Sequence, residues 1–130
     1  YTSVETGDCS IRNAFAANDA VSFGSIINAY TQPFLLLYNH RKDRGYRMEA
    51  FANAIRQSTA KPVCIGVIGE HKKACARYMQ RTTGIRAQAV ERPKEWIQAQ
   101  NVRHVLCAGN IKGEGRQFLE EMIEEARQNV

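Results

Sequence analysis

Short apolar runs separated by amphipathic stretches set the pattern of this chain. Three runs, bounded by polar residues, glycine or proline, stand out: Pro33–Tyr38, Val63–Ile68 and the weaker Val102–Cys107. Runs of about four to eight such residues are typical of strands buried on both faces of a parallel sheet. We expect these three strands to lie together at the centre of the sheet. Ile11–Phe15 alternates less cleanly and predicts an edge strand, and Ile85–Val90 predicts another short strand.

Between the runs, apolar side chains recur at helical spacing. The clearest stripe is formed by Met48, Phe51, Ala52 and Ile55. Similar stripes predict helices around residues 74–79 and 118–126. Asp19 is expected to cap a helix that runs to about Tyr30, and a short helix over Pro93–Gln98 would begin with proline in its first turn. Strands that alternate with helices predict an α/β fold, a three-layer Rossmann-like sandwich with a mostly parallel sheet.

Length and composition limit the class of protein. The chain has 130 residues, 44% of them hydrophobic and 24% charged. These values indicate one folded domain and exclude disordered, collagen-like and low-complexity chains. The longest apolar run, Phe34–Tyr38, is far shorter than the roughly 20 residues of a membrane-spanning helix. No signal peptide opens the chain, and because it starts at Tyr1 rather than Met we expect it to be part of something longer.

Cysteine usage and net charge add two expectations. Four cysteines are scattered without a CxxC pair, which favours a reduced cytosolic compartment and gives no reason to expect a zinc site. Eighteen basic residues against 13 acidic residues give a net charge of +5. Such an excess suits an anionic partner, but charge alone is equally consistent with a basic surface that only serves solubility.

Three polar loops follow the three central strands. In an open parallel sheet, ligands bind beyond the carboxyl ends of the strands, so residues 39–47, 69–71 and 109–115 are expected to meet at one edge. The first loop carries Arg41, Lys42, Arg44 and Arg47 against the single Asp43. Arginine side chains match carboxylate and phosphate oxygens, and the start of the following helix adds partial positive charge. The loop is either an anion site or a solvated basic surface.

The glycines near the last predicted helix give a weaker signal. Gly109, Gly113 and Gly115 surround Asn110 and Lys112 and would let a backbone approach a phosphate, although a plain structural turn is the better interpretation of the pattern. None of the nine glycines is followed by lysine, so the chain has no GxxxxGK[ST] phosphate loop and would supply only part of an ATP site.

Three other residues suggest only structural roles. His71 and His104 have no metal-binding partner at helical spacing, and His104 is expected to be a core histidine. Trp96 is expected to pack against the sheet.

Four strings in this order resemble one family: Asn13–Ala20, Asn39–Arg44, Gly69–Glu70 and Gly109–Gly113. From about Ile11 to the end, the chain looks like the C-terminal domain of the ligase subunit of poly-γ-glutamate synthase. That subunit belongs to the wider Mur ligase family of ATP-dependent amide-bond formers.

The resemblance implies a mechanism that uses ATP and Mg²⁺. Such ligases phosphorylate a carboxylate to an acyl phosphate, which an amine, here that of glutamate, converts to a γ-amide. The C-terminal domain closes over the nucleotide and helps to receive the incoming amino acid. Residues 1–130 would then be one domain of a longer protein whose phosphate loop lies in a preceding domain, and this chain alone would be inactive.

The resemblance also implies residue roles. Asn18 and Asn13 would contact the nucleotide, although the string Phe15–Asp19 has Ala17 and Asp19 where Mur ligases carry histidine and proline. The catalytic candidates, from a segment that resembles the family's Asp-Arg-Asp-Lys-Gly string, are Arg41, Asp43 and Arg44. The candidates for substrate binding are Lys42, Arg47, Glu70 and Asn110. No residue is assigned to a metal.

Partners and location follow from the same resemblance. The expected partners are the ATP-binding domain of the same ligase, membrane subunits of a capsule-type synthase, glutamate and poly-γ-glutamate, and assembly with a second copy of the chain stays open. The expected place is the cytoplasmic face of the cell membrane. Two alternatives stay open: a non-catalytic module that binds a nucleotide or another anion, and a nucleic-acid binder, which is favoured only by charge. The second lacks the aromatic platform and dense basic stripe typical of that role, so no nucleic acid is expected.

Overall fold

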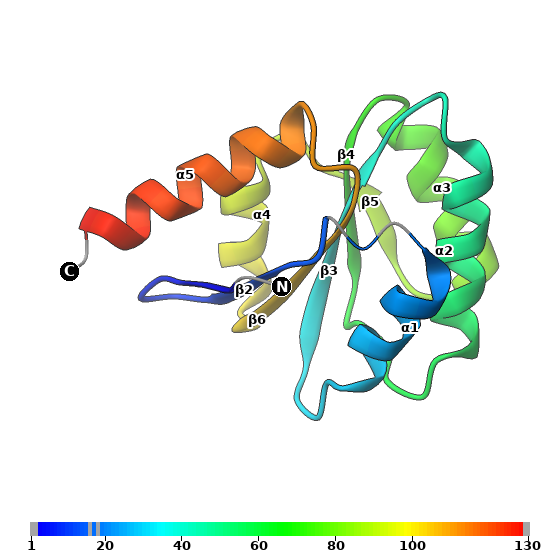
Figure 1. Ribbon diagram of the computed structural model, residues 1–130, viewed down its shortest axis with the longest axis horizontal. Helices are drawn as coiled ribbons and strands as arrows, with labels where there is room; N and C mark the ends of the chain where they lie inside the picture. Colours follow the sequence, from blue (N-terminus) through cyan, green and yellow to red (C-terminus); the bar gives the residue numbers. More distant parts are fainter. Residues whose placement is uncertain (1–2, 16, 18, 129–130) are drawn as a thin grey trace.

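The computed structural model describes residues 3–15, 17 and 19–128, which form one sheet with helices on both faces (Figure 1). The strands are β1 (Ser3–Glu5), β2 (Ser10–Asn13), β3 (Phe34–His40), β4 (Ile65–Gly69), β5 (Ala87–Ala89) and β6 (His104–Gly109). The helices are α1 (Ala20–Asn28), α2 (Gly45–Gln57), α3 (Lys72–Thr83), α4 (Pro93–Gln100) and α5 (Glu114–Gln128). The predicted α/β class is therefore confirmed.

The order of strands across the sheet is β1-β2-β6-β3-β4-β5. Every neighbouring pair is parallel except β1 and β2, which are antiparallel. The three strands predicted from apolar runs, β6, β3 and β4, are adjacent at the centre, as expected. All seven residues of β3 are buried, which explains why this strand gives the clearest apolar run.

The prediction of an edge strand at Ile11–Phe15 is wrong. Only the first part of that segment, Ile11–Asn13, lies in β2, and β1 pairs with β2 on the outside, with Val4 opposite Ile11. A strand of three residues is too short to show a period, so β1 left no signal in the sequence.

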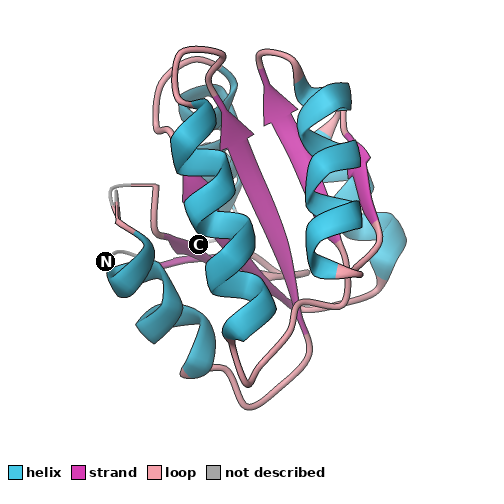
Figure 2. Ribbon diagram, turned by 90° about the vertical axis from the view of Figure 1, so that its right-hand side faces the viewer, coloured by secondary structure: helices cyan, strands magenta, loops and turns pink. Residues whose placement is uncertain are grey.

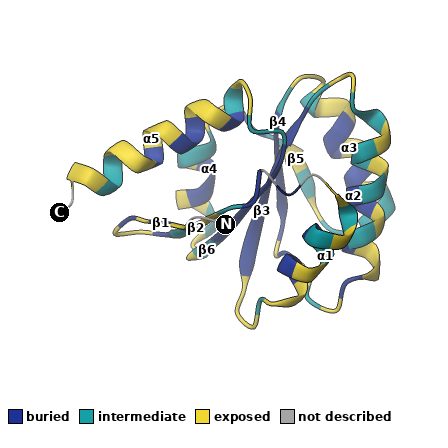
Figure 3. Cartoon of the chain, viewed as in Figure 1, coloured by how far each residue is buried: buried dark blue, intermediate teal, exposed yellow. Residues whose placement is uncertain are grey.

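Two hydrophobic clusters lie on opposite faces of the sheet. One joins the sheet to α1, α2 and α3, where the Phe23 and Phe51 rings stack 4.7 Å apart; the other joins it to α4 and α5. Figure 2 is viewed from the side of α1–α3 and shows these helices in front of the strands. Figure 3 shows the central strands buried and the outer helix faces exposed. These are the three layers predicted from the alternation of strands and helices.

Several local predictions can be compared with the structure. Asp19 caps α1, because its Oδ1 accepts a hydrogen bond from the Ser22 amide at 2.8 Å, and proline opens α4. Trp96 is buried and lies over Gly66 of β4. His104, by contrast, is not a core residue: it is half-buried at the start of β6 and its Nε2 lies 2.8 Å from Gln32 Oε1.

Two further observations concern the cysteines and the helices. All four cysteines are free and buried, so the thiols at Cys64 and Cys107 pack as small hydrophobic groups. In the described part of the chain, no helix is long and apolar enough to span a bilayer.

Candidate functional site

The three polar loops meet at the carboxyl edge of the sheet. In the ladder, His40 pairs with Gly69 and Asn39 pairs with Gly109, so β3, β4 and β6 end at the same level. A pocket of about 350 Å³ opens there, and we call it the rim pocket. It is lined by Asn39, His40, Arg41, Gly69, Glu70, Lys112, Gly113 and Glu114. The prediction that these loops share one edge is confirmed.

Asn39 joins the loops that border the rim pocket. Its side chain is 2% exposed, and its Nδ2 donates to the backbone carbonyls of Asn110 and Lys112, the latter at 2.8 Å. Its own carbonyl accepts a hydrogen bond from the Asn110 amide at 2.9 Å. Sequence reasoning did not assign Asn39 a role, although a polar residue that ends a fully apolar run is a usable signal.

Glycines allow the neighbouring strands and α5 to approach Asn39. A Cβ added at Gly109 would lie 2.4 Å from the Asn39 carbonyl oxygen, and one at Gly115 would lie 2.6 Å from Asn39 Nδ2. Real Cβ atoms do not occupy such positions, so these glycines are needed for close packing. This supports the structural interpretation of Gly109 and Gly115 over a direct phosphate contact.

The basic loop is partly neutralised from within. Arg41 and Asp43 form a two-point ion pair, with Nε to Oδ1 and the second nitrogen to Oδ2 both at 3.2 Å. The backbone amide of Lys42 donates to Glu70 Oε1 at 3.2 Å, which links the loops after β3 and β4. Of the predicted site residues, Arg41 and Glu70 line the rim pocket, and Asp43 and Lys42 contact them directly.

Arg44 and Arg47 lie at the start of α2. Arg44 is the N-cap residue, but no side chain caps this helix end and no acidic residue lies in its first turn. Arg44 Nε is buried without a hydrogen-bond partner. An uncapped helix start and two guanidinium groups together favour an anion. The unpartnered Nε is therefore a donor that a phosphate or carboxylate oxygen would satisfy.

Glu114 fixes the opposite side of the rim pocket. Its Oε2 accepts from the Gly69 amide at 2.8 Å, and its Oε1 pairs with Lys72 Nζ at 3.0 Å. Lys72 also pairs with Glu91 at 3.2 Å. Burial alone would lower the pKa of Lys72, but the hydrogen bonds that its ammonium group donates to Glu114 and Glu91 raise that pKa above its ordinary value. Sequence reasoning missed this ion-paired group, because its members come from three separate segments.

His40 supplies a neutral imidazole to the rim pocket. The side chain is 5% exposed and its Nδ1 has no hydrogen-bond partner. Burial lowers the pKa of His40 below its ordinary value, and the nearby His71 lowers it further, against the opposing effect of Glu70 and Asp43. Burial therefore favours the neutral form of the ring.

The remaining candidates lie outside the lining of the rim pocket. Asn13 ends β2 opposite Cys107, two residues short of the level of Gly109, and its Oδ1 accepts from the Phe15 amide at 3.2 Å. Asn110 borders the pocket through its bond to Asn39, and its Oδ1 accepts from the Lys112 amide at 2.8 Å. Asn18 lies outside the described residues.

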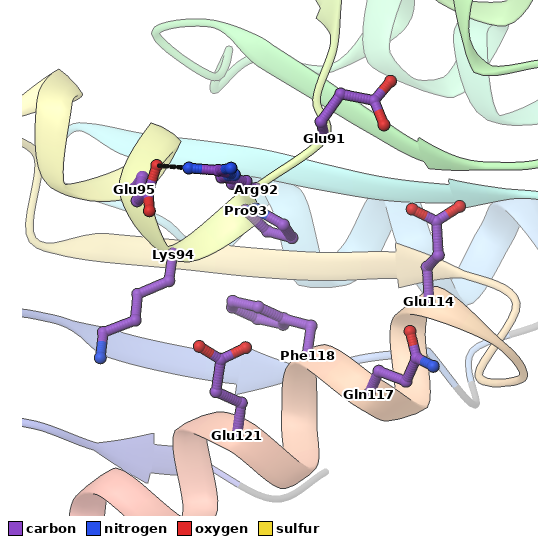
Figure 4. Close-up of a pocket in the computed structure, with 9 residues that line it drawn as sticks. All are labelled: Glu91, Arg92, Pro93, Lys94, Glu95, Glu114, Gln117, Phe118 and Glu121. Carbon is purple, nitrogen blue, oxygen red and sulfur yellow. Dashed lines mark ion pairs between the residues drawn. The ribbon is translucent and has the colours of Figure 1, made fainter.

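A second pocket of about 310 Å³ lies between α4 and α5 (Figure 4). Four glutamates line it, Glu91, Glu95, Glu114 and Glu121, and only Glu95 pairs with another residue drawn there, Arg92 at 3.6 Å. The lining also holds two basic residues, Arg92 and Lys94, so the glutamates outnumber them and the balance of charge disfavours phosphate and carboxylate groups. The rim pocket is therefore the better candidate for an anionic ligand.

Basic side chains near the rim pocket offer donors to an anionic group. Arg41 and Lys112 line the pocket, and the unpartnered Arg44 Nε belongs to the same loop as Arg41 but lies outside the lining. Guanidinium groups match anionic oxygens. Within residues 3–15, 17 and 19–128, no group of three or more His, Cys, Asp or Glu side chains is arranged to hold a metal ion.

Comparison with known proteins agrees with the fold. The chain resembles the folylpolyglutamate synthase of Thermotoga maritima, known from a crystal structure, with a TM-score of 0.70 at 15% sequence identity. The match covers 98% of this chain and 32% of that one, so the chain spans about a third of its structural neighbour. None of the curated proteins compared with the chain matches it. The sequence profile of the poly-gamma-glutamate synthase CapB C-terminal domain matches residues 2–125, and the chain belongs to that family.

Proposed function

We propose that this chain is the C-terminal domain of an ATP-dependent amide ligase that makes poly-γ-glutamate through an acyl phosphate. In this proposal the domain closes over the nucleotide and helps to bind the incoming glutamate. Family membership supports the ligase context. The observation that carries the anion-binding role is the uncapped start of α2 beside Arg44, whose Nε is buried without a partner at the edge where the three loops meet.

Each residue near the rim pocket has a role in this proposal. Arg44 contacts a phosphate or carboxylate oxygen, and the Arg41–Asp43 pair holds the loop in position. Lys42 and Arg47 add positive charge, while Glu70 and Asn110 offer acceptors to the ammonium group of glutamate. Asn13 and Asn18 are the residues proposed to contact the nucleotide.

ATP with Mg²⁺ supplies the phosphoryl group in the proposed reaction, and both are held mainly by another domain. The positive charge at this edge stabilises negative charge that develops on the transferred oxygens. Closure of the domain over the site excludes water, which protects an activated carboxylate from hydrolysis. Further proposed partners are the membrane subunits of the synthase at the cytoplasmic face of the membrane and a second copy of the chain.

Replacement of Arg44 by alanine in the complete synthase tests the proposal. The change removes a charge-assisted contact worth about 1.5–3 kcal/mol. Polymer synthesis should slow by about tenfold to a hundredfold. Arg44→Lys should recover little activity, because a point charge does not reproduce the planar guanidinium. The measurement is incorporation of labelled glutamate, with thermal melts of each variant.

Arg56→Ala is the matched control, because Arg56 lies exposed at the other end of the same helix. This variant should keep wild-type synthesis. If Arg44→Ala also keeps it, the loop is a solvated basic surface or part of a non-catalytic anion-binding module. If Arg44→Ala loses activity only together with its folded state, Arg44 is a structural residue.

A further inference from the structure

Positive charge is concentrated on one side of the molecule. Residues 41–86 hold eleven lysines and arginines but only three acidic residues, and the rest of the chain holds seven basic and ten acidic residues. The first group includes α2 and α3, which cover one face of the sheet, whereas α5 on the other face carries five glutamates and two arginines. A surface that only serves solubility does not require this separation of charge.

Helix α3 presents the most regular part of this positive surface. Lys73, Arg77 and Arg81 are spaced by four residues and are all exposed, whereas Cys75, Ala76 and Met79 are the buried residues of the same helix. We call Lys73, Arg77 and Arg81 the α3 stripe. Helix α3 contains no acidic residue, so its own side chains offer the stripe no ion-pair partner.

The α3 stripe is also unpaired with the rest of the described chain. None of its three side chains forms an ion pair with any described residue. The neighbouring Lys72 behaves differently, because Glu91 and Glu114 hold it within 3.2 Å. Two nearby carboxylates are thus satisfied by Lys72, and the stripe stays available to an external anion.

Position and spacing suggest which anion. Helix α3 begins directly after the loop 69–71 of the rim pocket, so Lys73 is the end of the stripe nearest that pocket. Successive stripe residues are about 6 Å apart along the helix axis. An extended γ-linked glutamate unit has five backbone bonds and one free carboxylate, and it also repeats at about 6 Å.

We propose that the α3 stripe binds the poly-γ-glutamate chain and leads it away from the rim pocket. The identity of the polymer rests on the proposed function. The place where the polymer binds rests on the exposed and unpaired side chains of the α3 stripe. The sequence pattern did not indicate a dense basic stripe, and the observed one is sparse, with only three charges. It therefore suits weak, repeated contacts with a moving polyanion, since exposed ion pairs are individually weak.

The test is the binding of a fluorescent γ-linked glutamate oligomer to the chain, measured by fluorescence anisotropy without ATP. In the variant Lys73→Glu/Arg77→Glu/Arg81→Glu, the affinity should fall at least about tenfold. The charge-conserving variant Lys73→Arg/Arg77→Lys/Arg81→Lys should stay within about threefold of wild type. Binding should weaken at least about tenfold between about 20 and 200 mM salt, because exposed charges are screened.

A second triple variant controls for net charge. Arg12→Glu/Arg116→Glu/Arg127→Glu changes three exposed arginines outside α3 and lowers the net charge by the same amount. This variant should bind the oligomer with an affinity within about threefold of that of the wild type. Equal losses in the two charge-reversed triples, or no binding by the wild type, would overturn the inference. So would tighter binding of a single-stranded oligonucleotide of equal charge through the same three residues, which would indicate a nucleic-acid surface.

The binding assay and the ligation assay separate two kinds of failure. If the complete synthase adds glutamate but the α3 triple binds the oligomer as well as wild type does, the inference is wrong and the proposed function stands. If oligomer binding depends on the stripe but no glutamate is ligated, the proposed function is wrong.

Discussion

Asn39 connects loops that are far apart in the sequence. Its side-chain amide donates to two backbone carbonyls in the turn before α5, and its own backbone is paired on both sides within the sheet. A buried amide that satisfies two carbonyls cannot be removed without leaving both acceptors unpaired. The geometry of the rim pocket therefore depends on one side chain that contacts no ligand in the proposed function.

Asn39→Ala should lower the free energy of unfolding by about 2–3 kcal/mol, because the carbonyls of Asn110 and Lys112 lose their partner. Urea unfolding of the chain measures this effect. Asn53→Ala, on the exposed face of α2, should change stability by less than about 0.5 kcal/mol. If the two variants are equally stable, the hydrogen bonds of Asn39 do not hold the turn.

We expect His40 to make the free energy of unfolding depend on pH. Because burial lowers the pKa of His40 in the folded state, the unfolded chain binds the proton more readily, and its ordinary pKa is 6.5. The neutral ring therefore favours folding above pH 6.5, and this advantage is lost as the pH falls below that value. Asp19 does not interfere, since its pKa is lowered from 3.8 and its titration lies well below this window.

His40→Phe should reduce the loss of stability between about pH 7.5 and 5.5, because phenylalanine keeps a ring beside Tyr38 but takes up no proton. Thermal unfolding at several pH values measures this slope in both proteins. Parallel slopes for wild type and variant would show that His40 does not titrate in this range.

At the scale of elements, the ends of the strands are set by close backbone packing. Gly109 has φ +95° and lies against the backbone of Asn39, whereas Gly113, at φ +63°, has open space around its Cα. The two glycines thus separate the cost of a left-handed backbone from the cost of a steric clash.

Gly109→Ala should destabilise the fold by about 2–4 kcal/mol, since strain and overpacking act together. Gly113→Ala should cost only about 1 kcal/mol, because only the backbone is strained. Chemical denaturation of both variants gives the comparison. Equal costs would mean that the loop after β6 relaxes away from Asn39.

Some elements were predictable and others were not. Apolar runs identify β3, β4 and β6 because these strands are buried on both faces, and Asp19 and Pro93 mark the starts of their helices by chemistry that acts locally. β1 is too short to show a pattern. His104 is misassigned because an apolar neighbourhood in the sequence does not reveal that the start of a strand lies near the surface.

At the scale of the whole molecule, the strand topology predicts where the site lies, but it does not predict the contacts between the residues of the site. The parallel order of β6, β3 and β4 is enough to bring the three loops together. The Arg41–Asp43 pair depends on side-chain conformations. The Lys72–Glu114 pair joins residues 42 positions apart, which no local pattern encodes. The roles given to Asn13, Arg44, Arg47 and the other candidates remain predictions.

The last prediction concerns the chain without any other domain. No glycine in the sequence is followed by lysine, so the phosphate loop expected of such ligases is absent, and the structural neighbour is about three times as long as this chain. We expect the purified 130-residue chain to hydrolyse no ATP and to ligate no glutamate. The assays are phosphate release and incorporation of labelled glutamate, compared with a mock preparation.

Addition of the separately prepared ATP-binding domain should restore turnover only if the two parts assemble. Turnover by the chain alone above the mock level, and lost in Arg44→Ala, would show that the rim pocket carries out the chemistry without a phosphate loop.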